Sequence, residues 1–598
     1  MNNKVLERHE IDDKYKWDVE SLYKDLDEWE ADYRKLEDRL EEFIGLKGGL
    51  SKSPEALLEA LQKRDEIASL ISNLYSYASL RSDEDTRNSS YQALQDKAFR
   101  MYIKVDEKMA FFIPEILEFS EEDLLAYIGA NKELQVYEHG LREILRRKKH
   151  ILSEREEAIL SKVGEISSSP ENVFSMLNNA DLKFPSIKNQ EGEELEITHG
   201  SYIPLMTSKD RGIRRDAFKS MYSVYGGLKN TFASILDGEL KSNKFFAEMR
   251  GYKNTMEASL DGNNISVDVY NNLIETIHNN MEPMYRYISL RKSAMELDEI
   301  HMYDIYNPIV EDVDLKYSFE EAKDLIEKAL RPLGEDYLEI VREGFDSGWI
   351  DVYENVGKRS GGYSGGSYES KPFILLNYKG TLDCVFTTAH EMGHSIHSYL
   401  TRKHQPYFYG SYGIFVAEVA STVNEVLLIN YLLENTESRE EKVYILNHFI
   451  DAFRATVYRQ TMFAEFEKII NEYVAEGGAL TADYLNETYG DLNRLYFGDE
   501  MFLDEEIRSE WSRIPHFYYN YYVYQYATGY SAAVTIAHKI LRKEEGIVDK
   551  YLNFLSKGSS DYPLNILREL GVDMETTEPI EDALKVFEDL VEEMEKLI

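Results

Sequence analysis

Residues 387–398 read TTAHEMGHSIHS, and they bring three histidines and a glutamate into one short stretch. In a helix each residue turns by about 100°, so His390 and His394, four residues apart, project side by side. Two neutral imidazoles placed in this way can take two positions of a tetrahedral zinc ion, and Glu391 lies close enough to hold a metal-bound water. The spacing therefore predicts a metal centre with His390 and His394 as ligands and Glu391 as the base.

A catalytic zinc centre of this design takes three protein ligands, so a third ligand must lie elsewhere in the chain. The metzincin continuation would require Gly at 397 and His at 400, but the chain has His397 and Leu400, which excludes that class. We interpret His397 as a structural histidine rather than a ligand. Glu418 is the first carboxylate after His394, in a chain otherwise rich in acidic residues, and it is the predicted third ligand.

The segment AEVASTVNEVLLINYLL, which Glu418 opens, has the pattern of an amphipathic helix. Glu425 follows Glu418 by seven residues and returns to within about 20° of the same helix face. We therefore expect Glu425 to lie beside the metal centre and to orient one of the ligating histidines.

The composition bounds the class of protein. The chain has 598 residues, of which 43% are hydrophobic and 30% are charged, a balance typical of globular proteins. No uninterrupted apolar run reaches the roughly 18 residues of a membrane span, and the charged amino terminus lacks the apolar segment of a secretory signal. The single cysteine, Cys384, cannot form an intramolecular disulfide and is assigned no chemistry. These features predict a soluble cytoplasmic protein.

The charge argues against two kinds of partner. The formal net charge is −41, from 109 acidic and 68 basic residues. A surface of this sign repels phosphate backbones and anionic lipids, so we expect neither nucleic acid nor a membrane as partner. The pattern predicts no particular oligomeric state.

Helical periodicity dominates the chain and places a boundary near residue 185. Residues 21–44 carry apolar side chains at three- and four-residue steps, and the first 180 residues are expected to form packed antiparallel helices. Residues 182–205 lose this period and predict two short strands around a glycine-containing turn. We therefore divide the chain into an N-terminal helical region, 1–185, and a catalytic region, 186–598.

Two unusual segments precede the metal-binding stretch. Residues 358–371, KRSGGYSGGSYESK, predict a flexible loop, and residues 371–381, KPFILLNYKGT, predict a strand. The edge of that strand offers main-chain groups to an extended peptide. Gly361 and Gly362 are either hinges of a loop that folds over a bound peptide or part of a mobile surface connection. Thr381 or Asp383 is expected to cap the following helix.

The stretch FILLNYKGTLDCVFTTAHEMGHSIHS, followed by FVAEVASTVNEVLL, resembles the oligoendopeptidase F branch of the thimet-oligopeptidase-like zinc metallopeptidases. YKWDVESLY and HFYYNYYVYQYATGYSAA resemble the same branch, so the resemblance spans nearly the full chain. It implies a mainly α fold: a large two-lobed helical ellipsoid with a deep substrate channel and a small β-sheet beside the His-Glu-x-x-His helix. It also implies one Zn²⁺ ion held by His390, His394 and Glu418, with Glu391 as general base and acid.

The aromatic stretch at residues 511–530 supplies further candidates. On a helix, His516 would share a face with Tyr519, Tyr522 and Tyr526. Relatives in the wider family use a histidine and tyrosines after the metal motif to bind substrate and to stabilise the tetrahedral intermediate. His516 matches that histidine, whereas the tyrosines align only with a gap. Tyr526 is the first candidate for the oxyanion donor, Tyr522 and Tyr524 are candidates for substrate binding, and Tyr524 is the alternative donor.

Together these features predict a zinc metalloendopeptidase that hydrolyses internal bonds of short unstructured peptides. A zinc carboxypeptidase or other exopeptidase on the same scaffold is the alternative function. A catalytically idle peptide-binding protein would leave Glu391 without a purpose.

Overall fold

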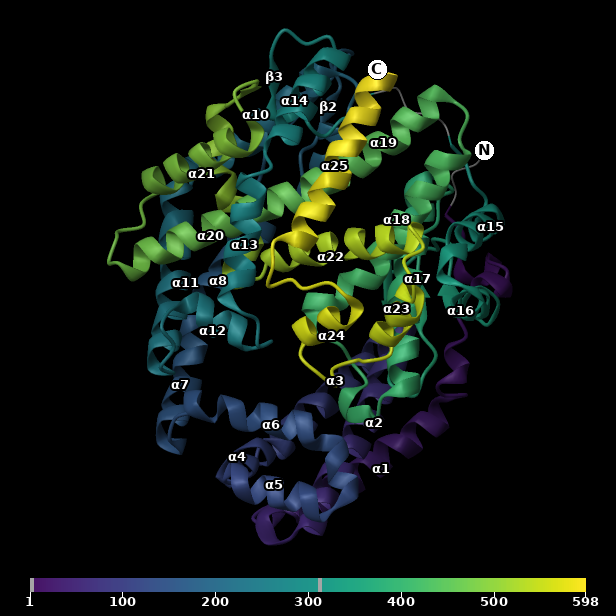
Figure 1. Cartoon of the computed structure of the whole chain (residues 1–598), viewed down its shortest axis with the longest axis vertical. Coiled ribbons are helices and arrows are strands. Elements are labelled where there is room, and N and C mark those ends of the chain that lie inside the picture. Colours follow the sequence, from purple (N-terminus) through teal and green to yellow (C-terminus); the bar gives the residue numbers. More distant parts are fainter. Residues whose placement is uncertain (1–4, 310–314) are drawn as a thin grey trace. The chain divides into compact units, whose positions relative to one another are not determined.

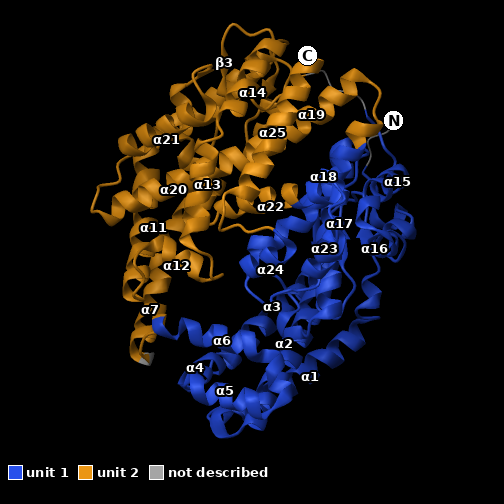
Figure 2. Cartoon of the chain, viewed as in Figure 1, with its two compact units in different colours: residues 1–149, 315–431, 536–571 blue, residues 150–314, 432–535, 572–598 orange. Residues whose placement is uncertain are grey.

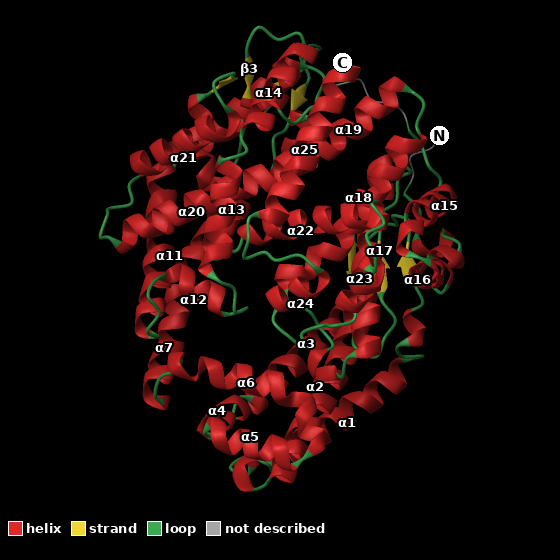
Figure 3. Ribbon diagram, in the orientation of Figure 1, coloured by secondary structure: helices red, strands yellow, loops and turns green. Residues whose placement is uncertain are grey.

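The protein is mostly helical, with a few short strands, as the computed structural model of the chain shows (Figures 1 and 3). The structure describes residues 5–309 and 315–598. The first four residues of the charged amino-terminal stretch lie outside these ranges. The predicted mainly α fold is confirmed.

The described chain divides into two compact units, shown in Figure 2. Unit 1 comprises residues 1–149, 315–431 and 536–571, and unit 2 comprises residues 150–314, 432–535 and 572–598. Each unit is thus assembled from three stretches of the chain. The predicted regions 1–185 and 186–598 divide the sequence, whereas the two units each combine three stretches of it. The division into these regions stays a prediction.

The elements of unit 1 are helices around one three-stranded sheet. Its helices are α1 (Leu26–Ile44), α2 (Pro54–Glu84), α3 (Ser89–Met109), α4 (Phe112–Glu118), α5 (Glu121–Ala130), α6 (Glu138–Arg146), α15 (Phe319–Ala329), α16 (Glu335–Asp346), α17 (Leu382–His404), most of α18 (Ile414–Asn435), α23 (Ile547–Leu555) and α24 (Pro563–Leu570). Its strands are β4 (Ile350–Asp351), β5 (Tyr363–Gly365) and β6 (Phe373–Leu375).

Unit 2 is also helical, and its strands form two short pairs. Its helices are α7 (Glu154–Ser167), α8 (Ser169–Met176), α9 (His199–Met206), α10 (Arg211–Gly227), α11 (Lys229–Met249), α12 (Thr255–Asp261), α13 (Val267–His278), α14 (Glu282–Ala294), α19 (Arg439–Phe453), α20 (Arg459–Ala475), α21 (Ala482–Phe497), the first part of α22 (Tyr524–Leu541) and α25 (Glu578–Leu597). Its strand pairs are β1 (Ile187–Lys188) with β2 (Glu194–Leu195), and β3 (Ile300–His301) with β7 (Met501–Phe502).

The β1–β2 pair is the predicted hairpin within residues 182–205. The two strands are antiparallel, and the turn between them contains Gly192 with φ +83°. Glycine reaches this left-handed conformation without the steric cost that a Cβ would add. The hairpin prediction is confirmed.

The amino-terminal helices of unit 1 follow directly from local sequence signals. Asp25 caps α1 through the N–H of Glu28, and Ser53 caps α2 just before Pro54. The apolar face of α1 is buried in one hydrophobic cluster with α2 to α6. These helices form the predicted packed bundle as far as α6, whereas α7 and α8, which lie within the predicted first 180 residues, belong to unit 2.

A small sheet connects that bundle to the metal-motif helix. The strand order is β4-β6-β5, with β4 parallel and β5 antiparallel to the central β6. Phe373 and Leu375 of β6 belong to the hydrophobic cluster of α1–α6, and α17 packs against β5 and β6. The predicted small sheet beside the His-Glu-x-x-His helix is confirmed. The prediction that the FILLNY strand offers a free edge is wrong, because β6 has a neighbour on each side.

Helix α18 is the only helix within the described ranges that is long and apolar enough to cross a membrane by length and composition. About two thirds of its most apolar window, 67%, is buried inside the structure. It also carries Glu418 and Glu425. A core helix of a globular protein has the same properties.

Candidate metal centre and active site

Helix α17 carries the first three predicted site residues. Thr381 caps it by accepting a hydrogen bond from the N–H of Cys384, so Thr381 rather than Asp383 is the cap. The cap fixes the start of the helix directly after the strand segment. His390, Glu391 and His394 then lie on two successive turns of α17.

Gly393 sets the distance between α17 and α18. A Cβ at this position would lie 2.7 Å from the carbonyl oxygen of Ala420 and 2.7 Å from the Cα of Ser421. These contacts are with backbone atoms, so only glycine permits so close an approach of the two helices. Next to the crossing, the Asn424 side chain donates to the carbonyl oxygen of Ala389 at 3.1 Å.

The close approach brings Glu418 to the two histidines. Its Oε2 lies 3.4 Å from His390 Nε2 and 3.5 Å from His394 Nε2, and the two Nε2 atoms lie 3.2 Å apart. Three ligand atoms bound tetrahedrally to zinc at 2.0–2.1 Å would lie about 3.3 Å from one another. The donor set, two imidazoles and one carboxylate, fits a divalent metal both in chemistry and in spacing.

Glu425 holds the ring of His390. Its Oε1 lies 2.8 Å from His390 Nδ1, as predicted for a residue that orients a ligand. Nδ1 therefore donates its proton to the carboxylate, and Nε2, once it loses its own proton, can bind a metal.

The charges of this group shift the pKa values of its members in the metal-free protein. Burial acts to lower the pKa of His390, but the carboxylates of Glu418 and Glu425 outweigh it and raise that pKa to about 10. Burial acts to raise the pKa of Glu418, but the two imidazoles hold it well below its usual range. Without a metal, His390 is therefore an imidazolium that binds a carboxylate.

Glu391 is adjacent to His390 in sequence, and its carboxylate is buried next to the glycine segment. Its side chain is buried, and this burial raises its pKa above the usual value for a glutamate. A Cβ at Gly362 would lie 3.8 Å from Glu391 Oε1, so the glycine segment passes directly over the carboxylate. A carboxylate with a raised pKa is suited to accept a proton and to give it back.

The glycine segment is partly a strand, which corrects the prediction of a flexible loop for residues 358–371. β5 runs along α17: Gly362 lies by Thr387 and Glu391, and Ser364 Oγ lies 2.8 Å from Ser395 Oγ. β5 is an outer strand of the sheet, so the edge beside Glu391 belongs to β5 and not to FILLNY.

The end of α2 holds the start of this segment. The Tyr363 hydroxyl donates to Asp83 Oδ2 at 2.7 Å, and the Arg359 N–H donates to the Asp83 carbonyl oxygen at 3.0 Å. The N–H and hydroxyl of Thr86 both donate to the Gly357 carbonyl oxygen. The amino-terminal helices thus position the strand that passes over Glu391.

His397 lies apart from the three ligand atoms. Its ring is buried and stacks on Tyr412 with ring centroids 3.6 Å apart, and burial lowers its pKa to about 3. Its Nδ1 has no hydrogen-bond partner. This agrees with a structural, neutral histidine, although one of its nitrogens is unsatisfied.

The aromatic stretch at 511–530 is not one helix. Short 3₁₀ helices at Glu505–Arg513 and Pro515–Tyr518 are followed by a loop, and α22 begins only at Tyr524. The predicted shared helix face is therefore wrong. The loop nevertheless brings His516, Tyr522 and Tyr526 together: Tyr526 Oη lies 3.5 Å from His516 Nε2, and the rings of His516 and Tyr522 are parallel.

Tyr524, by contrast, is buried and packs against Tyr270. Burial, together with the charge of Arg459, lowers the pKa of His516, so its ring is neutral at neutral pH. Within unit 2, His516 is therefore a neutral hydrogen-bonding group that lies beside the Tyr526 hydroxyl.

Two residues with unusual backbone angles shape the loop between His516 and Tyr526. Asn520 and Tyr521 have φ of 43° and 55°, a region that non-glycine residues rarely adopt. Ser259 Oγ donates to the Asn520 carbonyl oxygen, and the Tyr521 N–H donates to Glu467. Burial raises the pKa of Glu467 to about 8, so this anchor is a neutral acid at neutral pH.

Sequence reasoning missed Gly393, Asn424 and Asp83. Gly393 does carry a signal, because an isolated glycine inside a helical pattern often marks a close packing contact. Asn424 lies on the side of α18 that faces Ala389 of α17, about 120° around the helix from Glu418. Asp83 carries no signal, because its partner Tyr363 lies 280 residues away in the sequence.

The fold and the site define a class: a mainly helical metallopeptidase with a His-Glu-x-x-His pair and a distant glutamate. The sequence matches Peptidase family M3 over residues 204–586 and Oligopeptidase F over residues 115–184. The chain therefore belongs to peptidase family M3, and it is a metalloendopeptidase of the oligoendopeptidase F type.

The relatives cover all or nearly all of the chain. It is 48% identical to Oligopeptidase PepF of Bacillus subtilis over 100% of this chain and 89% of that protein. It matches the crystal structure of oligoendopeptidase-F from Enterococcus faecium at 38% identity and a TM-score of 0.75, over 96% of this chain and 99% of the other. A peptidase structure from Chlamydophila abortus matches at 36% identity and a TM-score of 0.93, over 100% of both chains.

Replacing Gly393 by Ala should weaken metal binding without unfolding unit 1. The added Cβ must push α18 away by part of an ångström, because the atoms that it meets are backbone. We expect at least a roughly ten-fold loss of metal affinity, as for other changes that displace a ligand. Competition with a chromogenic chelator measures it. Gly129→Ala, on α5 with open space around its Cβ position, is the matched control. Unchanged affinity in Gly393→Ala would contradict the role of this contact.

Metal binding should release a proton. Because the pKa of metal-free His390 is about 10, its imidazolium must deprotonate before Nε2 can bind a metal. Between about pH 7 and pH 9 we expect about one proton released per ion, and an affinity that rises roughly ten-fold per pH unit. Calorimetry in two buffers with different ionisation enthalpies counts the protons. Binding without proton release in this range would show that His390 is already neutral.

Asp83→Ala should loosen β5. The change removes the carboxylate that accepts from Tyr363, a contact of the kind worth about 1–3 kcal/mol. We expect amide hydrogen exchange at residues 357–366 to become at least about ten-fold faster. Asp96→Ala, which removes an exposed ion pair with Arg100 on α3, is the control and should leave this segment unchanged. Equal exchange in both variants would contradict the tether.

Proposed function

We propose that the protein is a zinc-dependent oligoendopeptidase that hydrolyses internal bonds of short unstructured peptides. The observation that carries this proposal is the spacing of His390 Nε2, His394 Nε2 and Glu418 Oε2, which lie 3.2–3.5 Å from one another with Glu391 alongside. Zinc is favoured over other divalent ions because two imidazoles and one carboxylate are its usual catalytic ligands.

A divalent metal held there would lower the pKa of a water molecule and polarise the substrate carbonyl. Glu391 would take the proton from that water and deliver it to the departing amine. Burial supports both steps, because it raises the pKa of Glu391 towards the range in which a carboxyl group exchanges protons. Glu425 would keep the His390 ring oriented throughout.

Substrate binding would use the edge of β5. An extended peptide can pair its main chain with an outer strand, which tolerates many side-chain sequences. Gly361 and Gly362 lie where this edge approaches Glu391, and the open space around the Cβ position of Gly361 leaves room for a peptide. The edge therefore replaces the FILLNY strand in the proposed binding mode.

His516 and Tyr526 would stabilise the tetrahedral oxyanion, with Tyr522 as a substrate contact. Their ring contacts in unit 2 and the neutral state of His516 support this role. The burial of Tyr524 favours Tyr526 as the donor. Loss of such a donor typically costs about 10²–10³ in turnover.

The proposed substrates are short peptides, and the proposed location is the cytoplasm, since the only cysteine is the free Cys384. The net charge of −41 supports the absence of nucleic acid and membrane partners.

An internally quenched peptide blocked at both ends tests the function. The metal-loaded wild type should cut it between internal residues, because a blocked peptide offers no free terminus to an exopeptidase. Glu391→Gln should keep its metal but lose at least about 10³ in kcat, since the base is gone. Glu339→Gln, an exposed position on α16, is the control and should cut as the wild type does.

Two results would contradict the proposal. Cleavage by Glu391→Gln at the wild-type rate would remove Glu391 as the base. Cleavage only of peptides with a free carboxyl terminus would favour the carboxypeptidase alternative.

A further inference from the structure

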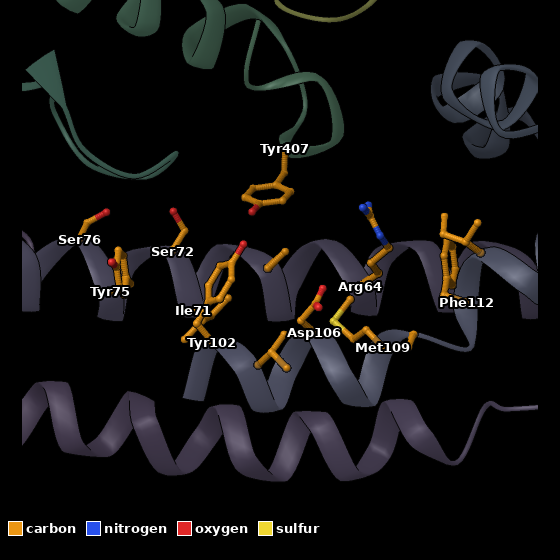
Figure 4. A pocket seen from close by; sticks show the side chains of 14 residues that line it. Arg64, Ile71, Ser72, Tyr75, Ser76, Tyr102, Asp106, Met109, Phe112 and Tyr407 are labelled. Atoms are coloured by element: carbon orange, nitrogen blue, oxygen red, sulfur yellow. The ribbon is translucent and has the colours of Figure 1, made fainter. Parts of the chain in front are cut away.

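A pocket of about 510 Å³ lies in unit 1 between α2 and α3 (Figure 4). Ala68, Ile71, Ser72 and Tyr75 of α2 line one wall, and Tyr102 of α3 lines another. Tyr407, which follows the end of α17, points into it from above in the figure. Arg64 and Asp106 also line the pocket, so its wall combines aromatic and aliphatic side chains with one basic and one acidic group.

Exposed apolar side chains of α3 lie at and beside the pocket. Tyr102 is 52% exposed, and its neighbours on α3, Phe99 and Ile103, are 48% and 51% exposed. The rings of Tyr102 and Phe99 both lie near Tyr75 on the pocket wall. A pocket with this rim suits a large apolar side chain on a segment that is otherwise solvated.

The strand over Glu391 leads to this pocket. β5 starts where Gly362 passes Glu391, and the Gly366 carbonyl oxygen accepts from Arg402 at 3.2 Å near the end of α17. Beyond it, Glu369 accepts hydrogen bonds from Ser69 and Asn73 of α2, each adjacent in sequence to a residue of the pocket wall.

A contact between two aromatic rings connects the segment after β5 to the pocket. The Tyr368 ring lies 5.2 Å from the Tyr407 ring, between their centroids. The segment that follows β5 therefore ends directly beside the pocket, and a peptide that follows the edge of β5 away from Glu391 is led there.

The length of α17 gives the distance. From Glu391 to the end of the helix at His404 there are 13 residues, which span about 20 Å at 1.5 Å per residue. Tyr407 lies three residues further on. An extended peptide advances about 3.3 Å per residue, so about six residues reach from the cleaved bond to the pocket.

The strand direction tells which end of the peptide reaches it. β5 runs from Glu391 towards the pocket, and antiparallel pairing is slightly more stable per residue than parallel pairing. A peptide antiparallel to β5 therefore sends its amino-terminal part towards the pocket.

We propose that this pocket binds an apolar or aromatic side chain about six residues before the cleaved bond. The proposal rests on the proposed endopeptidase function and adds a distal subsite to it. Such a subsite would make the enzyme favour peptides long enough to reach the pocket.

The test compares two matched substitutions. Ala68→Trp fills the pocket from α2, and Ala93→Trp places the same side chain at an exposed position of α3 outside it. Ala110→Trp is a second variant that fills the pocket. Ala110 lines the pocket but is exposed, so its side chain is not part of the hydrophobic core. Each is assayed, with the wild type, on blocked quenched peptides.

Three peptides separate length from side chain. One has about three residues before the cleaved bond, too few to reach the pocket, and two have about eight, with Phe or Ser at the sixth position. For Ala68→Trp and Ala110→Trp we expect kcat/KM on the long Phe peptide to fall about ten-fold, mainly through KM, because one apolar side chain loses its site. The short peptide and the Ala93→Trp variant should show no change.

Cleavage of the short peptide at the wild-type rate also shows that a filled variant is folded. Equal losses on short and long peptides, no loss on the long Phe peptide, or a preference for extension only after the cleaved bond would each overturn the proposal.

Binding separates the subsite from the chemistry. In a Glu391→Gln background, fluorescence anisotropy of the labelled long Phe peptide should show about ten-fold weaker binding when Ala68→Trp is added. If the wild type cuts no blocked peptide, the proposed function fails, and this binding measurement still decides the subsite. Equal binding with and without Ala68→Trp overturns it.

Discussion

The contact on which the site depends is the crossing of α17 and α18 at Gly393. The two histidines and the third carboxylate come from different helices, 24 residues apart between His394 and Glu418. Their atoms reach the spacing of a tetrahedral site only because no side chain separates the helices at the crossing. The hydrogen bond from Asn424 to the Ala389 carbonyl oxygen joins the two helices next to the crossing.

The rest of unit 1 holds this crossing in place and brings a peptide edge to it. Phe373 and Leu375 anchor β6 in the core of the amino-terminal helices, and β5 is the outer strand next to β6. Asp83, at the end of α2, tethers the segment that enters β5. The helical bundle therefore does more than stabilise the protein, because it positions the strand that passes over Glu391.

The sequence predicts those parts of the site that depend on local spacing. His390, Glu391 and His394 lie on one helix, and Glu425 returns to the face of Glu418 after seven residues, so helical geometry alone relates them. The glycine segment was harder to predict, because β5 is a strand only through its pairing with β6. The tether from Asp83 to Tyr363 joins positions 280 residues apart, and no local pattern reports such a contact.

In the aromatic stretch at residues 511–530, the sequence pattern predicts the wrong local structure. Its periodicity favours one helix, yet Asn520 and Tyr521 adopt a left-handed backbone, which Ser259 and Glu467 support through bonds from distant helices. Tertiary contacts override local propensity there. The same loop brings His516 to Tyr526. These two residues therefore lie together as predicted, although they do not share a helix.

The most direct test of this account is a crystal structure of the zinc-loaded protein, with anomalous scattering measured at the zinc edge. The account predicts one ion per chain, bound by His390 Nε2, His394 Nε2 and Glu418 at about 2.0–2.1 Å, with Gly393 still against Ala420 and Ser421. A zinc ion held by other side chains, or bound by the histidines with Glu418 turned away, would contradict it.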